Sequence, residues 1–259
     1  ITFFMTSPFI NEIIAKIYIL LVFHVIMVNE GEKMKKNIFA ILKTIILFLL
    51  LFTFTDIVVG IFDIDVGTLS NKEKYLLGFG TEISFLIILF LAYRKTLVND
   101  FKEFFSDFFN NFEFAFKYYL IGFLVMVISN FIIVVFTKNG IAGNEESIRS
   151  LIEVAPLYMV FSVTLYAPFT EELIFRKGFR DVFKNNFIYV LVSGITFGAL
   201  HVITYIKTPM DYVYLIPYCS LGLAFAYTYS KSNNIFSTIS MHFLHNTMAI
   251  VLYLVGSGL

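Results

Sequence analysis

The sequence predicts an all-α, polytopic transmembrane helix bundle. Of its 259 residues, 58% are hydrophobic and 15% are charged, whereas a soluble domain is usually about half apolar and about a quarter charged. Seven apolar stretches are long enough to cross a bilayer, for which a helix needs about 20 residues. Backbone polar groups find no partners in lipid, so each stretch is expected to form a helix.

The seven predicted spans are joined by short links that leave no room for a separate soluble domain. They cover residues 38–62, 75–97, 116–136, 151–169, 187–206, 212–230 and 235–255. We divide the chain into residues 1–33, a probable upstream leader or extra helix, residues 34–144, the N-terminal transmembrane helices, and residues 145–259, a C-terminal transmembrane core.

The first 33 residues have two interpretations. Met34 begins Met-Lys-Lys-Asn, a basic cluster before an apolar run, and the codons for residues 30–33 are rich in purines. We therefore expect translation to start at Met34, with the preceding residues read from upstream sequence. The alternative is an eighth span over residues 13–28, which is short for a membrane helix. A signal peptide is less favoured because no small-residue cleavage site follows the apolar run.

Residues 101–117 have phenylalanines at 101, 104, 105, 108, 109 and 112 with charged side chains between them, a spacing typical of an amphipathic helix. Two placements remain open. The segment either lies in the membrane interface or forms the solvated beginning of the third span.

Basic residues in short loops predict the orientation, because they are retained in the cytoplasm. One set of loops holds Lys35, Lys36, Arg94, Lys95, Lys102, Arg176, Lys177, Arg180, Lys184 and Lys231. The opposite set holds Lys72, Lys74, Lys138, Arg149 and Lys207. Ten against five places Met34 and the 176–184 loop in the cytoplasm of a bacterium, and we expect the functional site to open there.

The composition excludes several other classes of protein. Net charge is zero, and no basic stripe of a nucleic-acid-binding protein is present. The single cysteine, Cys219, excludes an intrachain disulfide and a Cys-rich metal site. We interpret it as a small apolar residue in a helix.

Ionisable side chains gather within the apolar runs of the C-terminal half. They are Glu171, Glu172, Arg176, His201, His242, His245 and Asn246, the last included as a polar amide. Such groups are costly in a membrane, so they usually face the bundle interior and serve a function. Glu172 and Arg176 are four residues apart and share a helix face, and so do His242 and Asn246. A structural role for each alone is ordinary, but their convergence from three spans favours a catalytic site.

Two chemistries fit this set of residues. The sequence lacks the signatures of serine, aspartyl and zincin-type peptidases. Glu171, His201 and His242 would provide the two imidazoles and one carboxylate of an open zinc site. Alternatively, Glu171 and His201 would polarise a water without a metal, and His242 and Asn246 would donate to the oxyanion.

Three motifs in this half resemble those of one family. Residues 171–176 fit EExxxR, residues 197–201 fit FxxxH, and residues 242–246 fit HxxxN. The chain thereby resembles the CPBP family, which joins CAAX prenyl endopeptidases to bacteriocin-processing and immunity proteins and is also called the Abi family. The resemblance covers about residues 145–250, in which the motifs follow in order on three successive spans.

The resemblance implies a role for each motif residue: water activation by Glu171 and His201, ordering of the site by Glu172 and Arg176, and stabilisation of the tetrahedral intermediate by His242 and Asn246. The family is classed with metallopeptidases, and a metal-free glutamate mechanism is the competing view. One departure is visible, since Lys177 intervenes before Gly178 where the family often has glycine directly after the arginine. His245 lies outside the pattern and is expected to support the site or face the cavity.

The leading hypothesis is an intramembrane endopeptidase that cleaves a peptide or small membrane-associated protein. Bacteriocin or pheromone processing and self-immunity are the expected settings. The rival class is a non-catalytic bacteriocin immunity protein of the membrane. A transporter or proton relay is disfavoured because the two halves show no repeat symmetry.

Overall fold

Three long helices form the N-terminal half of the chain. They are α2 (Lys33–Ile61), α3 (Asn71–Ser106) and α4 (Phe108–Thr137). The computed structural model describes residues 33–137 and 142–257, with side chains from residue 38. The predicted leader and the alternative helix over residues 13–28 lie outside these ranges, apart from Lys33.

The start of α3 is fixed by a capping box. The Ser70 hydroxyl accepts a hydrogen bond from the Glu73 backbone N–H, and the Glu73 carboxylate accepts one from the Ser70 N–H. This arrangement satisfies backbone donors that the first turn of a helix otherwise leaves unpaired. The predicted span ends at residue 97. The helix itself continues for nine more residues, to Ser106, beyond the apolar stretch.

The phenylalanine-rich segment at 101–117 is shared between two helices. Asp107 has non-helical angles, φ −140° and ψ 61°, and separates the end of α3 from the start of α4. Asn111 fixes this corner by donating to the carbonyls of Glu103 and Phe104 at 3.2 and 3.0 Å. An independent interfacial helix is therefore absent here, and residues 108–117 form the beginning of the third long helix.

The C-terminal half starts with an amphipathic helix and ends with three long ones. Its elements are α5 (Gly143–Val154), α6 (Pro156–Phe161), η2 (Ser162–Tyr166), α7 (Ala167–Glu171), η3 (Glu172–Gly178), α8 (Phe179–Val182), α9 (Asn186–Ile203), η4 (Pro209–Tyr214), α10 (Leu215–Ser232) and α11 (Ile235–Ser257). From α6 to α8 the backbone is one continuous helical run, because the residues at each junction keep right-handed helical angles.

Five of the described helices are long and apolar enough to cross a membrane. They are Ile38–Ile61, Asn71–Ser106, Phe108–Thr137, Asn186–Ile203 and Ile235–Ser257. The other two predicted spans correspond to the α6–α8 run and to α10. The predicted start of one at residue 151 is wrong, because Ala155 is non-helical and precedes Pro156, and a residue before proline is disfavoured in a helix.

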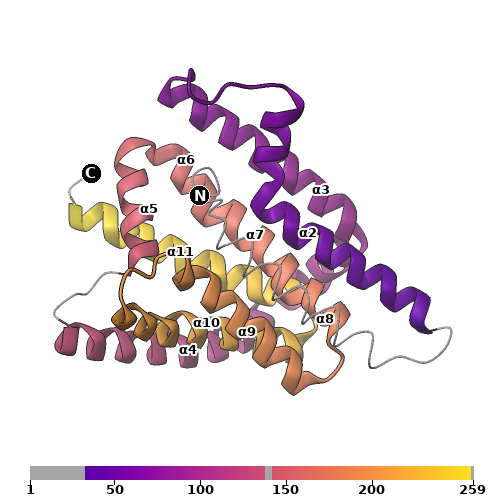
Figure 1. The fold of residues 1–259 in the computed structure, drawn as a ribbon. Helices are drawn as coiled ribbons and strands as arrows, with labels where there is room; N and C mark the ends of the chain where they lie inside the picture. Colours follow the sequence, from indigo (N-terminus) through magenta and orange to yellow (C-terminus); the bar gives the residue numbers. More distant parts are fainter. Residues whose placement is uncertain (1–32, 138–141, 258–259) are drawn as a thin grey trace.

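The α6–α8 run lies in the middle of the bundle (Figure 1). Helices α2 and α3 lie on one side of it, and α9, α10 and α4 form a layer on the other, with α11 against its centre. Glycines permit the close approach of α9 and α10, since a Cβ on Gly222 would lie 2.4 Å from the Gly194 carbonyl oxygen. Small residues at such contacts are typical of helix pairs in membranes. Cys219 is a half-buried helix residue in the same contact, as expected.

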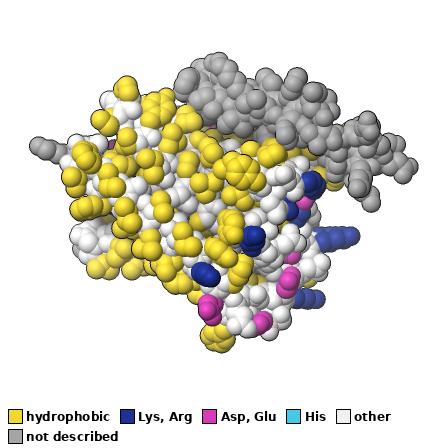
Figure 2. All heavy atoms as spheres, turned by 90° about the horizontal axis from the view of Figure 1, so that it is seen from below, with side chains coloured by type: hydrophobic (Ala, Val, Ile, Leu, Met, Phe, Trp, Pro, Cys, Tyr) yellow, Lys and Arg dark blue, Asp and Glu magenta, His cyan; other side chains and the backbone are white. Residues whose placement is uncertain are grey.

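Large apolar side chains cover much of the surface. On α4, Phe131 is 69% exposed, and the face shown in Figure 2 is broadly hydrophobic. Lys, Arg, Asp and Glu side chains gather on the right of that view, the side on which α8 lies in Figure 1. The protein is a multi-pass membrane protein with an apolar belt.

Candidate active site

Pro168 explains why the helix that carries Glu171 is irregular. In a regular helix the Ala167 N–H would bond to the Val163 carbonyl, but here it bonds to the Ser162 carbonyl, one residue further back. In this wider pattern the Val163 carbonyl would accept a hydrogen bond from the N–H of residue 168. That residue is Pro168, which has no N–H, so the Val163 carbonyl has no partner within the helix. The turn Ser162–Tyr166 is therefore wide. A second wide turn, η3, begins directly after Glu171.

Asn246 of α11 satisfies that carbonyl. Its side-chain nitrogen donates to the Val163 oxygen at 2.8 Å, which ties the last motif to the wide turn. One amide hydrogen of Asn246 remains for another acceptor. Asn246 therefore holds the helix with one amide hydrogen, and the other is left for the expected role as an oxyanion donor.

Glu171 faces two imidazoles from other helices. Its Oε2 atom lies 3.8 Å from Nε2 of His201 on α9 and 3.8 Å from Nε2 of His242 on α11. That oxygen is buried and has no hydrogen-bond partner among the described residues. The side chain as a whole is 19% exposed and lines the cavity described below. Because 3.8 Å is too long for a direct hydrogen bond, the three groups are poised around a shared space.

The tautomer of His201 follows from its backbone contact. Nδ1 lies 2.8 Å from the Phe197 carbonyl oxygen. A carbonyl only accepts, so Nδ1 carries the proton and donates. In the neutral ring Nε2 is then an acceptor, and it is directed at Glu171. The spacing FxxxH therefore orients its own histidine within one helical turn.

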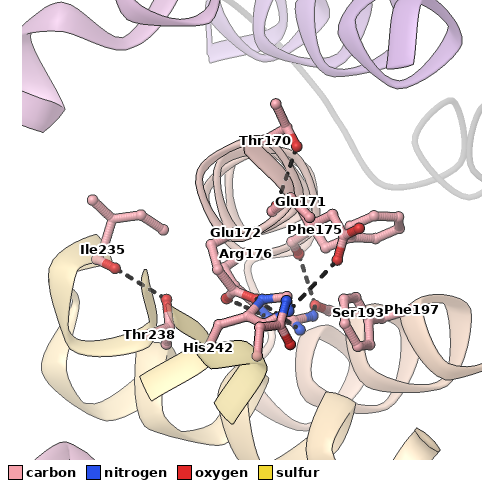
Figure 3. Close-up of polar contacts among 12 residues, drawn as sticks. Thr170, Glu171, Glu172, Phe175, Arg176, Ser193, Phe197, Ile235, Thr238 and His242 are labelled. Carbon is pink, nitrogen blue, oxygen red and sulfur yellow. Dashed lines mark hydrogen bonds and ion pairs between the residues drawn. The ribbon is translucent and has the colours of Figure 1, made fainter. Parts of the chain in front are cut away.

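His242 contacts both members of the carboxylate pair. Its Nδ1 atom lies 3.0 Å from Oε1 of Glu172, while Nε2 faces Glu171. Figure 3 shows the His242 ring beside these two groups, with Arg176 directed past it toward Ser193. A carboxylate only accepts, so Nδ1 of His242 carries a proton and donates it to Glu172.

Arg176 compensates the charge of Glu172 in the interior. Nε and Nη2 donate to the two oxygens of Glu172 at 2.9 and 3.3 Å, and both side chains are fully buried. Nη1 donates to the Ser193 hydroxyl at 3.0 Å, which in turn donates to the Phe175 carbonyl. The expected pairing of Glu172 with Arg176 is present. Removing one partner of such a buried pair typically costs about 3–5 kcal/mol.

The departure at Lys177 does not disturb this end of the helix. Gly178 lies against α2, where the Thr44 hydroxyl donates to its carbonyl oxygen at 3.1 Å. A Cβ on Gly178 would come within 2.9 Å of the Thr44 methyl group. The glycine thus permits close approach one residue after the position expected from the resemblance, while the half-buried Lys177 contacts Asp181.

The site lines a cavity of about 470 Å³. Glu171, His201, His242, His245 and Asn246 all contribute to its wall. His245 lines it as expected, and its Nδ1 lies 3.3 Å from the hydroxyl of Tyr119 on α4. The cavity extends from these residues along the last turns of α9 and α11 to the polar face of α5, where Asn144 and Arg149 lie. Its wall combines these polar side chains with apolar ones such as Leu221 and Ile250.

The donors are of the kind that zinc prefers, and in this structure they lie further apart than the ligands of a loaded zinc site. Within the described ranges, no group of three or more His, Cys, Asp or Glu side chains is arranged to hold a metal ion. Donors of a tetrahedral zinc site lie about 3.3 Å apart for bonds of about 2.0 Å, whereas both imidazole nitrogens are 3.8 Å from Glu171 Oε2. The predicted metal therefore stays a prediction.

Two contributors to this region were missed in the sequence. Ser193 lies outside every motif, and nothing in its context indicates that it bonds to Arg176. Glu82 on α3 contacts the helix run from the other side. Its signal was present, because a carboxylate in the middle of an apolar stretch is unusual by the same rule that identified Glu171.

The comparisons with known proteins agree with the class defined by this fold and site. A sequence model of the family described as type II CAAX prenyl endopeptidase Rce1-like matches residues 153–248. These contain all three motifs, within the predicted C-terminal core. Together with the relatives below, this match supports the CPBP family and, at a coarse level, an intramembrane protease.

The relatives come from bacteria. The chain is 28% identical to the UPF0177 protein YvdC of Lactococcus lactis over 134 residues, covering 51% of this chain and 49% of the relative. It is also 28% identical to a candidate membrane peptidase, YdiL of Bacillus subtilis, over 148 residues, covering 51% and 57%. The chain thus spans about half the length of the curated relatives it matches. No solved structure matched the chain.

Proposed function

We propose that the protein is an intramembrane endopeptidase in which Glu171 activates a water. The observation that supports this most directly is the meeting of the Glu171 carboxylate with the Nε2 atoms of His201 and His242 at 3.8 Å in a cavity. Carboxylate and neutral imidazole are both acceptors, so a water between them can donate one hydrogen to each.

The proposed reaction conserves its protons. The water oxygen attacks the scissile carbonyl carbon while Glu171 takes one water proton. The oxyanion receives a hydrogen bond from Nε2–H of protonated His242 and from the remaining amide hydrogen of Asn246, and one such donor is typically worth about 3–4 kcal/mol. Glu171 then passes its proton to the leaving amine as the carbon–nitrogen bond breaks, which regenerates the carboxylate.

The substrate class follows from where the site lies. A cavity inside an apolar bundle is reached by a peptide or by a small membrane-associated protein, not by a large folded one. The protein is proposed to reside in the bacterial plasma membrane and to act in bacteriocin or pheromone processing or in self-immunity.

Comparison of peptides from cells tests the proposal. Membranes and medium are analysed from cells that express the wild-type chain, Glu171→Ala or the control Glu113→Ala, which removes an exposed carboxylate on α4. Peptide termini that vanish only with Glu171→Ala are expected. Identical peptide pools, with all three chains inserted at equal levels, would favour the non-catalytic immunity protein, for which Glu171→Ala retains protection against the bacteriocin.

Metal analysis separates the two possible chemistries. The purified chain is measured by inductively coupled plasma mass spectrometry before and after treatment with a chelator. The glutamate mechanism predicts activity that is independent of metal content. Stoichiometric zinc, lost together with activity and restored with it, would replace that mechanism by a zinc-bound water.

A further inference from the structure

Glu82 is a buried carboxyl group in the middle of α3, outside the catalytic motifs and outside the matched region. The residue is 5% exposed. Its Oε1 atom accepts hydrogen bonds from the Tyr158 hydroxyl at 3.0 Å and from the Ser162 hydroxyl at 2.8 Å. Its Oε2 atom is buried and has no partner among the described residues. An ionisable group in this state is costly inside a membrane, so it calls for a function.

The residues that Glu82 holds are those at which the helix run becomes irregular. Tyr158 lies on α6, and Ser162 is the first residue of the wide turn η2. The same Ser162 supplies the carbonyl that accepts the displaced Ala167 N–H. On α3 the contact is prepared by Gly78, because a Cβ there would lie 2.8 Å from the Tyr158 hydroxyl.

The wide turn is therefore held from two sides. Glu82 on α3 fixes the Ser162 side chain, and Asn246 on α11 fixes the adjacent Val163 carbonyl. Asn246 belongs to a motif of the site, whereas Glu82 acts on the opposite face of the same turn. Ser162 and Val163 both border the cavity.

The wide turn sets the direction of Glu171. A turn with one extra residue rotates all following side chains by about 100° relative to a regular helix, since each residue of an α-helix advances by that angle. If η2 relaxed to a regular helix, Glu171 would turn away from His201 and His242. The contacts that hold Ser162 thus determine whether the reacting groups meet.

We propose that Glu82 is a positioning residue that holds the wide turn at Ser162 and thereby directs Glu171 toward the two histidines. It contacts neither the substrate nor the water. The contacts engage one oxygen of the carboxyl group, so a glutamine, whose carbonyl oxygen is also an acceptor, should replace it. The effect on catalysis rests on the proposed peptidase function, whereas the effect on geometry does not.

Cysteine cross-linking measures the geometry without any activity. In a Cys219→Ser background, Glu171→Cys and His201→Cys are bridged in membranes by a short bis-methanethiosulfonate reagent. Neither replaced side chain makes a side-chain hydrogen bond to another described helix, so the pair reports on the turn with little disturbance. Intact mass distinguishes one bridging reagent from two singly attached ones.

The variants compared are Glu82→Ala, Glu82→Gln and the control Ser84→Ala, whose hydroxyl bonds only to the Gly80 carbonyl on the same helix among the described residues. We expect the bridged fraction to fall at least fivefold with Glu82→Ala and to stay within twofold of the parent with the other two. An unchanged bridged fraction in Glu82→Ala, or an equal loss in Glu82→Gln, would overturn the proposal.

The activity arm uses the Glu171-dependent peptides described above, in the chain with its native site. Glu82→Ala is expected to reduce them at least tenfold at equal protein level and equal melting temperature, and Glu82→Gln to restore them to within threefold. A cross-link that is lost in Glu82→Ala, with no Glu171-dependent peptides even from the wild-type chain, would count against the proposed function but support the positioning role. A cross-link that is retained in Glu82→Ala while its peptides are lost would contradict the positioning role alone.

Discussion

At the scale of single residues, the two histidines of the site differ in their hydrogen-bond partners. His201 is oriented by a carbonyl of its own helix, whereas His242 bonds to the fully buried Glu172 of another helix. Loss of His201 removes a proposed catalytic group and takes no hydrogen bond from a buried carboxylate. Loss of His242 also removes a hydrogen bond from a buried carboxylate, which typically costs about 1–3 kcal/mol.

This difference predicts distinct effects of His201→Ala and His242→Ala. Both are expected to abolish the Glu171-dependent peptides, by at least 100-fold. Only His242→Ala should lower the unfolding temperature in detergent, because only it leaves Glu172 without one of its partners. Equal unfolding temperatures for the two variants would contradict the assigned contacts, and Phe243→Ala, an exposed neighbour on α11, serves as the control.

Residue spacing predicted part of the site correctly. The four-residue separation of Glu172 and Arg176 indicated a pair on one helix face, and that pair is present. Glu82 was missed because its partners lie 76 and 80 residues away in the sequence, and no spacing rule reaches that far. Ser193 was missed because a serine in an apolar helix usually bonds to its own backbone.

At the scale of helices, Pro168 accompanies the wide turn in the run from α6 to α8. It leaves one backbone donor missing just after the displaced Ala167 N–H. The sequence showed Pro168 beside the acidic pair, but the wide turns could not be predicted. The wide turn η2 is held by a hydrogen bond from Asn246 on α11 to the Val163 carbonyl, and these two groups meet only in the folded bundle.

The substitution Pro168→Ala tests the importance of this turn. The alanine N–H would bond to the Thr164 carbonyl and favour a regular helix. We expect peptide cleavage to fall at least tenfold while the unfolding temperature stays equal or rises, as for a strained functional site. Full activity in Pro168→Ala would show that Glu82 and Asn246 hold the turn without the proline.

The contact between α9 and α10 predicts an effect on stability. A Cβ on Gly222 would lie 2.4 Å from the Gly194 carbonyl oxygen, whereas a Cβ on Gly60 would meet no atom within 4 Å. Gly222→Ala is expected to destabilise the protein by about 1–3 kcal/mol, because overpacking displaces the backbone. Gly60→Ala should be neutral or slightly stabilising in the same thermal unfolding experiment.

At the scale of the whole molecule, two expectations about orientation diverge. The basic residues predict that the end with α8 is cytoplasmic. The cavity extends from Glu171 in the other direction, to Asn144 and Arg149 on α5. The expected cytoplasmic opening assumed that the site was reached from the α8 end, where Phe175 and Phe179 are buried. With the charge-based orientation, the cavity would face the outside of the cell.

Labelling of single cysteines in intact cells decides between them. In a Cys219→Ser background, Asn144→Cys is expected to react with a membrane-impermeant maleimide, and Lys231→Cys only after permeabilisation. This result would mean that the substrate arrives from the outer side, after export. The opposite pattern would restore a cytoplasmic opening and show that the basic residues misassign the orientation.

The pairing of Glu172 with Arg176 also bears on how the chain enters the membrane during synthesis. Both charges lie on one helix, four residues apart, so they neutralise each other as soon as that helix forms. The segment can leave the translocation channel as an internally compensated ion pair, before α9 and α11 have left the ribosome. His242 then joins a pair that is already in the lipid. At this position the ion pair is therefore complete within one helix and needs no later helix to compensate a buried charge.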